Sequence, residues 1–178
     1  AVQAEELIRL SQEKGLLLAE AIWTRYMPSR KMIDDILASG ILGKVTSLTA
    51  NLGYILPHVE RMQNPELAGG ALLDLGVYPI NFALMAFQGE VEKIDATAIM
   101  SPKGVDWMNS ITLSFADGKM AVLHSDMLAQ TDRQGVISGD QGYLEVQNIN
   151  NCEEIRVYDL NRKMTACYQV PEQINGYE

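Results

Sequence analysis

The stretch from Trp107 to Met127, WMNSITLSFADGKMAVLHSDM, decides the fold class. Apolar and polar residues alternate on both sides of Asp117-Gly118, as they do in half-buried β-strands. An Asp-Gly pair between two such runs is a strong signal for a tight hairpin. We therefore predict two antiparallel strands, 107–115 and 120–127.

The same pattern recurs along most of the chain. Strand-like runs begin at Val45 and at Ile94, two short ones flank the turn 138–142, and a last hairpin joins Glu154–Asp159 to Met164–Val170. Six or more strands joined by tight turns require a mainly antiparallel sheet. We predict an α+β fold with an open, mainly antiparallel β-sheet and helices on one face.

Two helices belong to this predicted sheet unit. Pro28 suits the first turn of one helix, which Gly40 ends. The other runs from about Gly70 to Gln88. Its predicted sheet-facing stripe consists of Leu73, Val77, Ile80, Leu84 and Phe87.

The first 26 residues have a different character. An amphipathic helix ends at Gly15, and the apolar run Leu16–Glu20 predicts a strand buried on both faces, as in a parallel sheet. A helix followed by such a strand is the tail of an α/β unit. Ala1 is not an initiator methionine, and Asn175–Glu178 break off after a strand, so we expect residues to be missing on both sides.

Composition argues against several classes of function. The formal net charge of -9 repels a phosphate backbone, so nucleic acid is not an expected partner. No apolar run approaches the roughly 18 to 20 residues that span a bilayer, so we expect a soluble protein and no membrane partner.

The cysteines and histidines predict neither a disulfide nor a metal site. The last hairpin pairs Cys167 with about position 157 rather than with Cys152, so we expect two reduced thiols, as in a cytoplasmic protein. His58 and His124 are far apart, and no cluster has zinc-ligand spacing.

A polar stripe on the second helix is the clearest candidate site. Asp74, Tyr78 and Asn81 fall at i, i+4 and i+7, and therefore on one face. Gly69-Gly70 lets another backbone or a ligand approach the start of the helix, and Pro79 bends it. Tyr78 and Asp74 are either a proton-transfer pair or a packed phenol with a hydrogen-bonded carboxylate.

Two other segments have open interpretations. Glu20–Pro28 carries Trp23 and Arg25 at the carboxyl end of the predicted parallel strand; it is either part of a ligand site or a linker that covers a domain seam. Tyr54, His58 and Arg61 lie in a stretch that is either a substrate loop or a solvated loop. The chain has no glycine-rich dinucleotide fingerprint, phosphate loop or Gly-x-Ser-x-Gly elbow.

Four segments together resemble the glucose-fructose oxidoreductase, inositol dehydrogenase and MocA (Gfo/Idh/MocA) family, in its dihydrodiol dehydrogenase-like branch. They are Glu20–Pro28 (EAIWTRYMP), Gly43–Val45 (GKV), Pro65–Ile80 (PELAGGALLDLGVYPI) and Ile137–Val146 (ISGDQGYLEV). The branch shares the Trp-Thr-Arg loop, and it has a tyrosine where inositol dehydrogenases have histidine.

The resemblance implies a division into domains and an activity. Residues 1–26 would end a truncated dinucleotide-binding (Rossmann) domain, and residues 27–178 would form the substrate-binding and dimerisation domain, like the carboxy-terminal domain of glyceraldehyde-3-phosphate dehydrogenase. The full-length protein would be a dehydrogenase that moves a hydride between NAD or NADP and a hydroxyl-bearing carbon of a sugar, polyol or diol. The cofactor would be bound mainly by the missing domain, and a homodimer would form through the sheet face.

The resemblance also implies residue roles. Tyr78 would be the acid/base and Asp74 would position the substrate hydroxyl, whereas Trp23 and Arg25 would line the cofactor cleft. Arg61, Asn81 and Tyr54 are the expected substrate-binding residues, and the family's proton-transfer lysine would lie shortly before Ala1. The alternative function is a non-catalytic sugar-binding or dimerisation module with the same fold.

Overall fold

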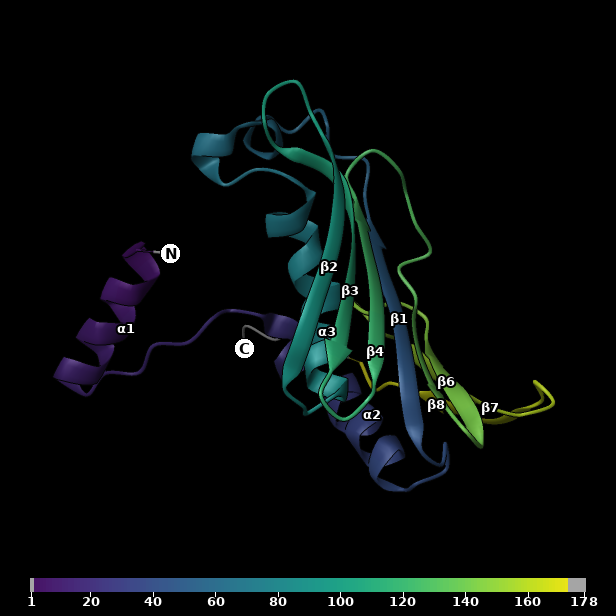
Figure 1. The fold of residues 1–178 in the computed structure, drawn as a ribbon. Helices are drawn as coiled ribbons and strands as arrows, with labels where there is room; N and C mark the ends of the chain where they lie inside the picture. Colours follow the sequence, from purple (N-terminus) through teal and green to yellow (C-terminus); the bar gives the residue numbers. More distant parts are fainter. Residues whose placement is uncertain (1, 173–178) are drawn as a thin grey trace.

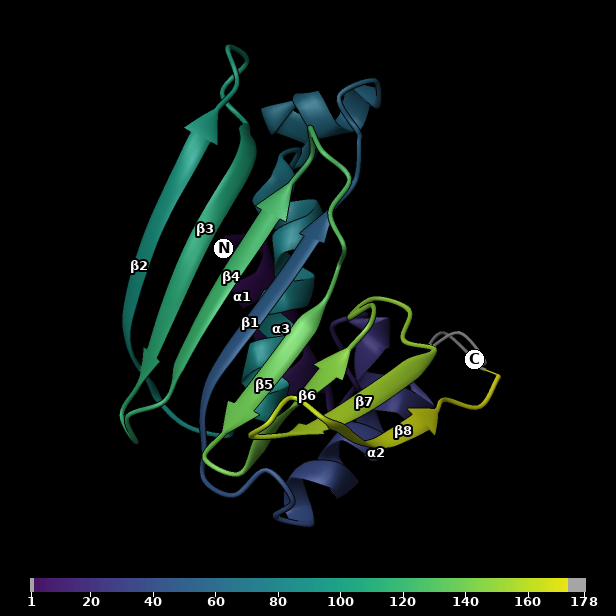
Figure 2. The same cartoon turned by 90° about the vertical axis from the view of Figure 1, so that its right-hand side faces the viewer.

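The computed structural model describes residues 2–172, and its centre is an eight-stranded sheet (Figures 1 and 2). The strands are β1 (Val45–Gly53), β2 (Val91–Met100), β3 (Asp106–Phe115), β4 (Met120–Asp126), β5 (Gly135–Gly139), β6 (Gly142–Val146), β7 (Glu154–Asp159) and β8 (Met164–Gln169). The predictions about Ala1 and Asn175–Glu178 lie outside the described residues.

The spatial order of the strands is β2-β3-β4-β1-β5-β6-β7-β8. The hairpins β2–β3, β3–β4, β5–β6 and β7–β8 are antiparallel, as predicted. Only β1 and β4 are parallel. The chain leaves β1, crosses one face of the sheet through a helical segment and returns at the β2 edge, which brings β4 beside β1 in the same direction. The predicted fold class is confirmed.

The crossing segment consists of several helical turns. It contains the short helices η2 (Glu60–Gln63) and η3 (Pro65–Leu67), then the π-helical turn η4 (Leu72–Gly76), which continues into α3 (Val77–Ala86). Helix α2 (Pro28–Ala38) begins at its proline, as predicted, and lies on the same side of the sheet (Figure 1).

The core lies between this helical layer and the inner face of the sheet. Leu48 on β1, Leu123 on β4 and Ile137 on β5 are fully buried there, and Leu75 and Phe82 pack against them from the helix. The outer face of the sheet has no helix over it in the described part of the chain (Figure 2).

The predicted sheet-facing stripe of the helix is only partly right. Phe87 is buried and Ile80 packs against the core, as predicted. Leu73 and Leu84, however, are 56% and 38% exposed, whereas Leu75, Pro79 and Phe82 are buried. The helix is apolar on nearly every side, so periodicity alone did not select the buried face. Its first turn is also π-helical: the Val77 N–H donates to the Leu72 carbonyl five residues back, which shifts the phase of the helix.

The same segment corrects the expectation that no apolar run approaches the length of a membrane span. Pro65–Ala86 spans 22 residues with a mean hydropathy of 1.4 in its most apolar window, which meets a length and composition criterion for a membrane span. About 44% of that window is buried inside the structure. Since helices that cover a sheet have the same composition, the segment is weak evidence for a membrane span.

The amino-terminal region confirms one element and contradicts another. Helix α1 (Val2–Lys14) forms as predicted and ends at Gly15, whose φ is 63°. The predicted strand Leu16–Glu20 is absent: the segment is irregular and Leu17 is 94% exposed. A strand needs a neighbouring strand for its backbone hydrogen bonds, and none of the eight strands pairs with this segment.

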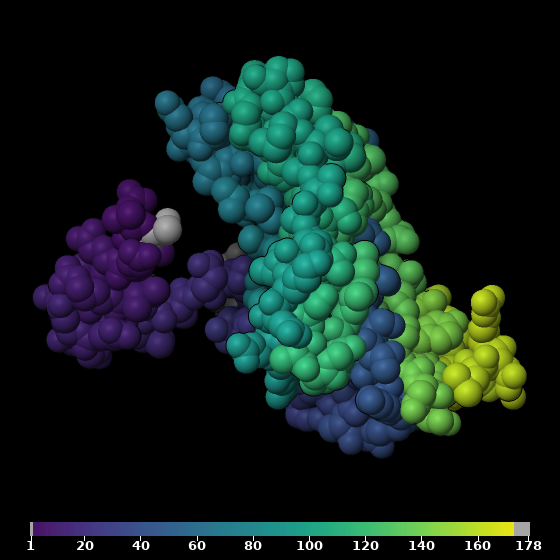
Figure 3. All heavy atoms as spheres, viewed as in Figure 1, coloured from purple at the N-terminus to yellow at the C-terminus, as the bar shows by residue number. Residues whose placement is uncertain are grey.

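Helix α1 buries none of its side chains (Figure 3). It stands apart from the sheet in Figure 1, joined to it by the irregular segment. The assignment of residues 1–26 and 27–178 to different domains stays a prediction.

Neither Cys152 nor Cys167 takes part in a disulfide within residues 2–172. Cys167 lies opposite Arg156 in the β7–β8 hairpin, one position from the expected partner. Cys152 is buried, and this burial raises the pKa of its thiol to about 11, so the thiol is protonated at neutral pH. Residues 2–172 contain no cluster of three or more potential metal ligands.

Gly69 and Gly70 fix the start of the crossing helix against the rest of the chain. A Cβ on Gly69 would lie 2.4 Å from the Arg61 carbonyl oxygen, and a Cβ on Gly70 would lie 2.4 Å from Asp106 Oδ1. Gly70 also has a φ of 108°, which favours glycine. The space that the glycines leave is therefore filled by the chain's own backbone and by Asp106.

We predict that Gly70→Ala lowers the free energy of unfolding by about 1–3 kcal/mol, because alanine is strained at this φ and its Cβ displaces Asp106. Gly104→Ala is the matched control: its φ is 91°, but nothing lies within 4 Å of a Cβ there. Urea unfolding followed by circular dichroism should show a clearly smaller loss for the control. Equal losses would mean that the contact with Asp106 contributes nothing.

Candidate active site

A pocket lies between the segment 19–26 and the crossing helix. Its volume is about 720 Å³. One wall is formed by Ala19, Glu20, Ala21, Ile22, Arg25 and Tyr26, and the other by Leu73, Asp74, Val77, Tyr78 and Asn81. The two segments that the sequence analysis singled out therefore face each other across one cavity.

A hydrogen bond joins these walls beside Tyr78. The indole Nε1–H of Trp23 donates to the Tyr78 hydroxyl at 3.1 Å. The two rings meet edge to face, with centroids 6.4 Å apart and planes at 69°. Trp23 begins the short helix η1 (Trp23–Tyr26), whose residue Thr24 is buried. This contact fixes the phenol at the pocket wall.

A second hydrogen bond joins the same turn to the helix. Arg25 Nε donates to Asn81 Oδ1 at 3.3 Å, and the Asn81 side-chain amide donates to the Val77 carbonyl at 2.8 Å. The Asn81 carboxamide thereby has a fixed orientation, with its oxygen toward the arginine. Arg25 and Asn81 both line the pocket.

The negative charge of Asp74 is compensated by an arginine from a more distant segment. Arg61 on η2 donates to its carboxylate at 2.5 Å. Arg61 is about half exposed and Asp74 is less so. An ion pair with this exposure stabilises the fold little. Its main effect is to orient the Asp74 carboxylate at the pocket and to compensate its charge.

Tyr54 lies apart from this group. Its hydroxyl accepts a hydrogen bond from Arg133 Nη1 at 3.0 Å, and the guanidinium of Arg133 stacks over its ring at 5.2 Å. Tyr54 does not line the pocket, and neither does His58 or Arg61. The substrate-binding role of Tyr54 therefore has no geometric support, whereas Arg61 reaches the pocket through Asp74.

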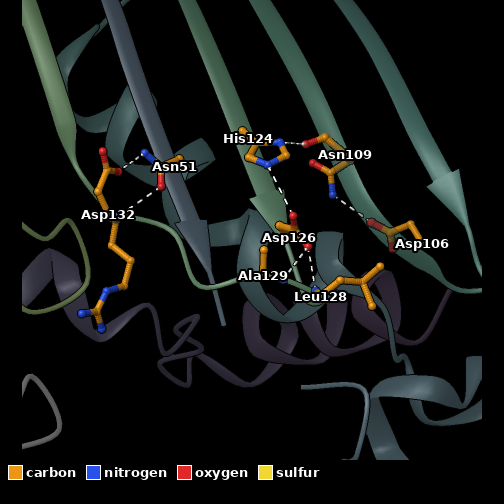
Figure 4. A network of polar contacts seen from close by, with 9 residues as sticks. Asn51, Asp106, Asn109, His124, Asp126, Leu128, Ala129 and Asp132 are labelled. Atoms are coloured by element: carbon orange, nitrogen blue, oxygen red, sulfur yellow. Dashed lines mark hydrogen bonds and ion pairs between the residues drawn. The ribbon is translucent and has the colours of Figure 1, made fainter. Parts of the chain in front are cut away.

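The structure adds two anchoring residues that the sequence analysis missed. Asp106 Oδ2 accepts from Asn109 Nδ2 at 2.8 Å (Figure 4). It also accepts from the Leu72 backbone N–H at 2.9 Å, and so holds the start of the helix. Arg30 Nη2 donates to the Met85 carbonyl at 2.6 Å near the end of α3. Burial lowers the pKa of Arg30, and the neighbouring Asp34 partly offsets this effect.

No local pattern could have revealed these anchors. Asp106 precedes a strand and lies 34 residues from the backbone group that it caps. For Arg30, the sequence spacing predicts only the ion pair with Asp34, four residues further along α2, and not the bond to Met85.

The outer face of the sheet carries a separate polar network (Figure 4). Asn51 Nδ2 donates to Asp132 at 2.6 Å. His124 Nδ1 lies 2.8 Å from the Asn109 carbonyl, and its Nε2 lies 3.9 Å from Asp126. A carbonyl oxygen only accepts, so Nδ1 carries the proton. This network lies outside the pocket described above, and no member lines that pocket.

Comparison with known proteins shows that the chain matches one part of several larger proteins. A family model described as the GFO/IDH/MocA C-terminal domain matches residues 31–145. A trans-1,2-dihydrobenzene-1,2-diol dehydrogenase of Danio rerio is 34% identical over 145 residues, which cover 81% of this chain and 43% of the relative. The enzyme of that name from Homo sapiens is 30% identical over 176 residues, covering 98% and 53%.

Solved structures have the same fold. The aldose-aldose oxidoreductase from Caulobacter crescentus, complexed with glycerol, matches with a TM-score of 0.84 at 21% identity, over 97% of this chain and 54% of that one. KijD10, a 3-ketoreductase from Actinomadura kijaniata in complex with NADP and TDP-benzene, matches with a TM-score of 0.83 at 24% identity, over 95% and 54%. The chain spans about half the length of the curated relatives it matches.

Proposed function

The chain belongs to the Gfo/Idh/MocA family of NAD(P)-dependent oxidoreductases, as a carboxy-terminal domain, and from this premise we propose an activity for the whole protein. It transfers a hydride between a nicotinamide cofactor and a hydroxyl-bearing carbon of a sugar, polyol or diol. The observation that carries the proposal is the convergence of Asp74, Tyr78 and Asn81 on one pocket, facing Arg25.

Tyr78 is the proton-transfer residue in this proposal. When the substrate carbon is oxidised, its hydroxyl proton passes to the ionised Tyr78 oxygen as the carbonyl forms, which leaves a neutral phenol; in reduction, the Tyr78 hydroxyl donates a proton to the carbonyl oxygen and becomes ionised. Bound nicotinamide supplies or accepts the hydride. Asp74 accepts a hydrogen bond from a substrate hydroxyl, and its ion pair with Arg61 holds the carboxylate in place.

The residues at this pocket suit the nicotinamide end of the cofactor. Arg25 and Asn81 offer the donors and acceptors that a nicotinamide carboxamide or a ribose hydroxyl needs. The described segments of the pocket wall include no glycine-rich turn that would bind a diphosphate through backbone N–H groups. We therefore assign Trp23 and Arg25 to the nicotinamide side of the cleft, and the diphosphate site to the half of the relatives that this chain does not match.

The pocket favours an uncharged, hydroxyl-rich substrate. Asp74 is paired with Arg61, and the pocket wall that carries the positive charge of Arg25 also carries the negative charge of Glu20, so the charges at the pocket balance. Leu73, Val77 and Ile22 add apolar surface that suits the carbon skeleton of a diol or sugar. The names of the relatives support this class, since they include a diol dehydrogenase and an oxidoreductase complexed with glycerol.

We predict that Tyr78→Phe lowers kcat of the intact protein by about 10²–10⁴-fold, because proton transfer is lost, and leaves binding of the nicotinamide cofactor unchanged. Steady-state kinetics with NAD⁺ and NADP⁺ and a panel of diols and sugars measures the first effect, and cofactor fluorescence titration measures the second. Tyr168→Phe, on the distant strand β8, is the matched control and should retain full activity. Unchanged turnover in Tyr78→Phe would remove Tyr78 from the chemistry and favour the non-catalytic module.

We also propose that two copies of the chain associate through the outer face of the sheet. No helix covers this face in residues 2–172, and it presents small polar residues with apolar ones among them. Val122, at its centre opposite Thr49 and Thr112, is 42% exposed. A cytoplasmic location for this dimer is consistent with Cys152 and Cys167 forming no disulfide in the described chain.

We predict that Val122→Lys converts the dimer into a monomer, because each interface would then bury two unpaired ammonium groups. Ile94→Lys is the matched control: Ile94 is 64% exposed and lies on the opposite face of the sheet. Size-exclusion chromatography with light scattering distinguishes the two states. A monomeric parent protein, or a Val122→Lys variant that stays dimeric, would contradict this interface.

A further inference from the structure

We propose that Trp23 is a positioning residue for Tyr78: its indole N–H orients the phenol oxygen in the pocket and favours the ionised phenol over the neutral one. The inference rests on the proposed function of Tyr78. It goes beyond that function in one respect. A residue of this chain, and not only residues that match the other half of its relatives, would influence the acid–base equilibrium of Tyr78.

The direction of the hydrogen bond between the two residues is unambiguous. An indole nitrogen is a donor only, whereas a phenol oxygen both donates and accepts. At 3.1 Å, Trp23 Nε1 must therefore donate to the Tyr78 oxygen. The bond uses acceptor capacity of the hydroxyl and none of its donor capacity, so it is compatible with Tyr78 giving its proton to a substrate.

Several contacts hold the donor in place. Trp23 belongs to the single turn η1, where Thr24 is buried and Arg25 is bonded to Asn81 one turn beyond Tyr78. The same turn thus contacts α3 at two points, through Trp23 and through Arg25. The edge-to-face contact of the Trp23 and Tyr78 rings fixes their relative orientation. A donor held in this way does not have to reorganise when charge develops on the phenol oxygen.

The bond is stronger when Tyr78 is ionised. Hydrogen bonds to a charged acceptor are shorter and about twice as strong as those between neutral groups. A fixed donor therefore stabilises the phenolate more than the phenol, which promotes removal of the substrate proton near neutral pH. By this argument, loss of the indole N–H should lower kcat at pH 7 by roughly five- to tenfold, with a smaller effect on KM.

The first test needs neither cofactor nor substrate. In this 178-residue chain labelled with ¹³Cζ-tyrosine, the Tyr78 signal is assigned by its loss in Tyr78→Phe and then followed by NMR as the pH is raised. We expect the midpoint of its titration to move to higher pH in Trp23→Phe. Trp107→Phe, which removes the other indole on strand β3, is the matched control and should leave the midpoint unchanged.

An unchanged Tyr78 midpoint in folded Trp23→Phe would overturn the inference. If circular dichroism shows that this variant is unfolded, benzothienylalanine, which has the shape of tryptophan and lacks the N–H, replaces the single remaining tryptophan of the Trp107→Phe chain. The same upward shift is expected there, and its absence would be equally decisive against the inference.

Kinetics of the intact protein separate an electrostatic role from a merely structural one. We expect the kcat of Trp23→Phe to recover as the pH rises, because a higher pH restores the ionised phenol. A loss of kcat that is the same at every pH would contradict the inference. Failure of the proposed function has a different signature: turnover is then retained in Tyr78→Phe, whatever the NMR midpoint does in Trp23→Phe.

Discussion

Attachment of the crossing helix to the sheet is the constraint on which the site depends. Leu75 and Phe82 pack into the core, the carboxylate of Asp106 binds the backbone at the start of the helix, and Arg30 binds a carbonyl near its end. The approach of Asp106 is possible because Gly70 has no side chain. The helix is therefore held at both ends and along one side, and its opposite side presents polar groups to a cavity at fixed positions.

The cavity combines segments that lie far apart in the chain. Trp23 and Arg25 each hydrogen-bond the helix across 55 or more positions, and Arg61 neutralises Asp74 from a third segment. Asp74, Tyr78, Asn81 and Arg25 are each oriented by a neighbouring side chain, which is the arrangement that proton transfer and hydroxyl binding require.

Local patterns in the sequence were sufficient for the hairpins and insufficient for contacts between distant segments. The Asp117-Gly118 turn and the alternating runs predicted the hairpins, because register and turn chemistry are encoded within a few residues. The strand expected at Leu16–Glu20 failed because apolarity does not reveal whether a partner strand is present. Spacing placed Asp74, Tyr78 and Asn81 together, but the bond from Trp23 and the cap from Asp106 depend on three-dimensional packing that no local pattern encodes.

We propose that this chain provides the substrate side of the catalytic cleft, with Tyr78 at the reacting carbon. A crystal structure of the intact protein with NADP⁺ and a bound diol tests this proposal. We expect a substrate hydroxyl within hydrogen-bonding distance of both Tyr78 and Asp74, with the Trp23 indole still donating to the phenol. A diol bound elsewhere, with Tyr78 out of reach of both the substrate and the nicotinamide, would contradict it.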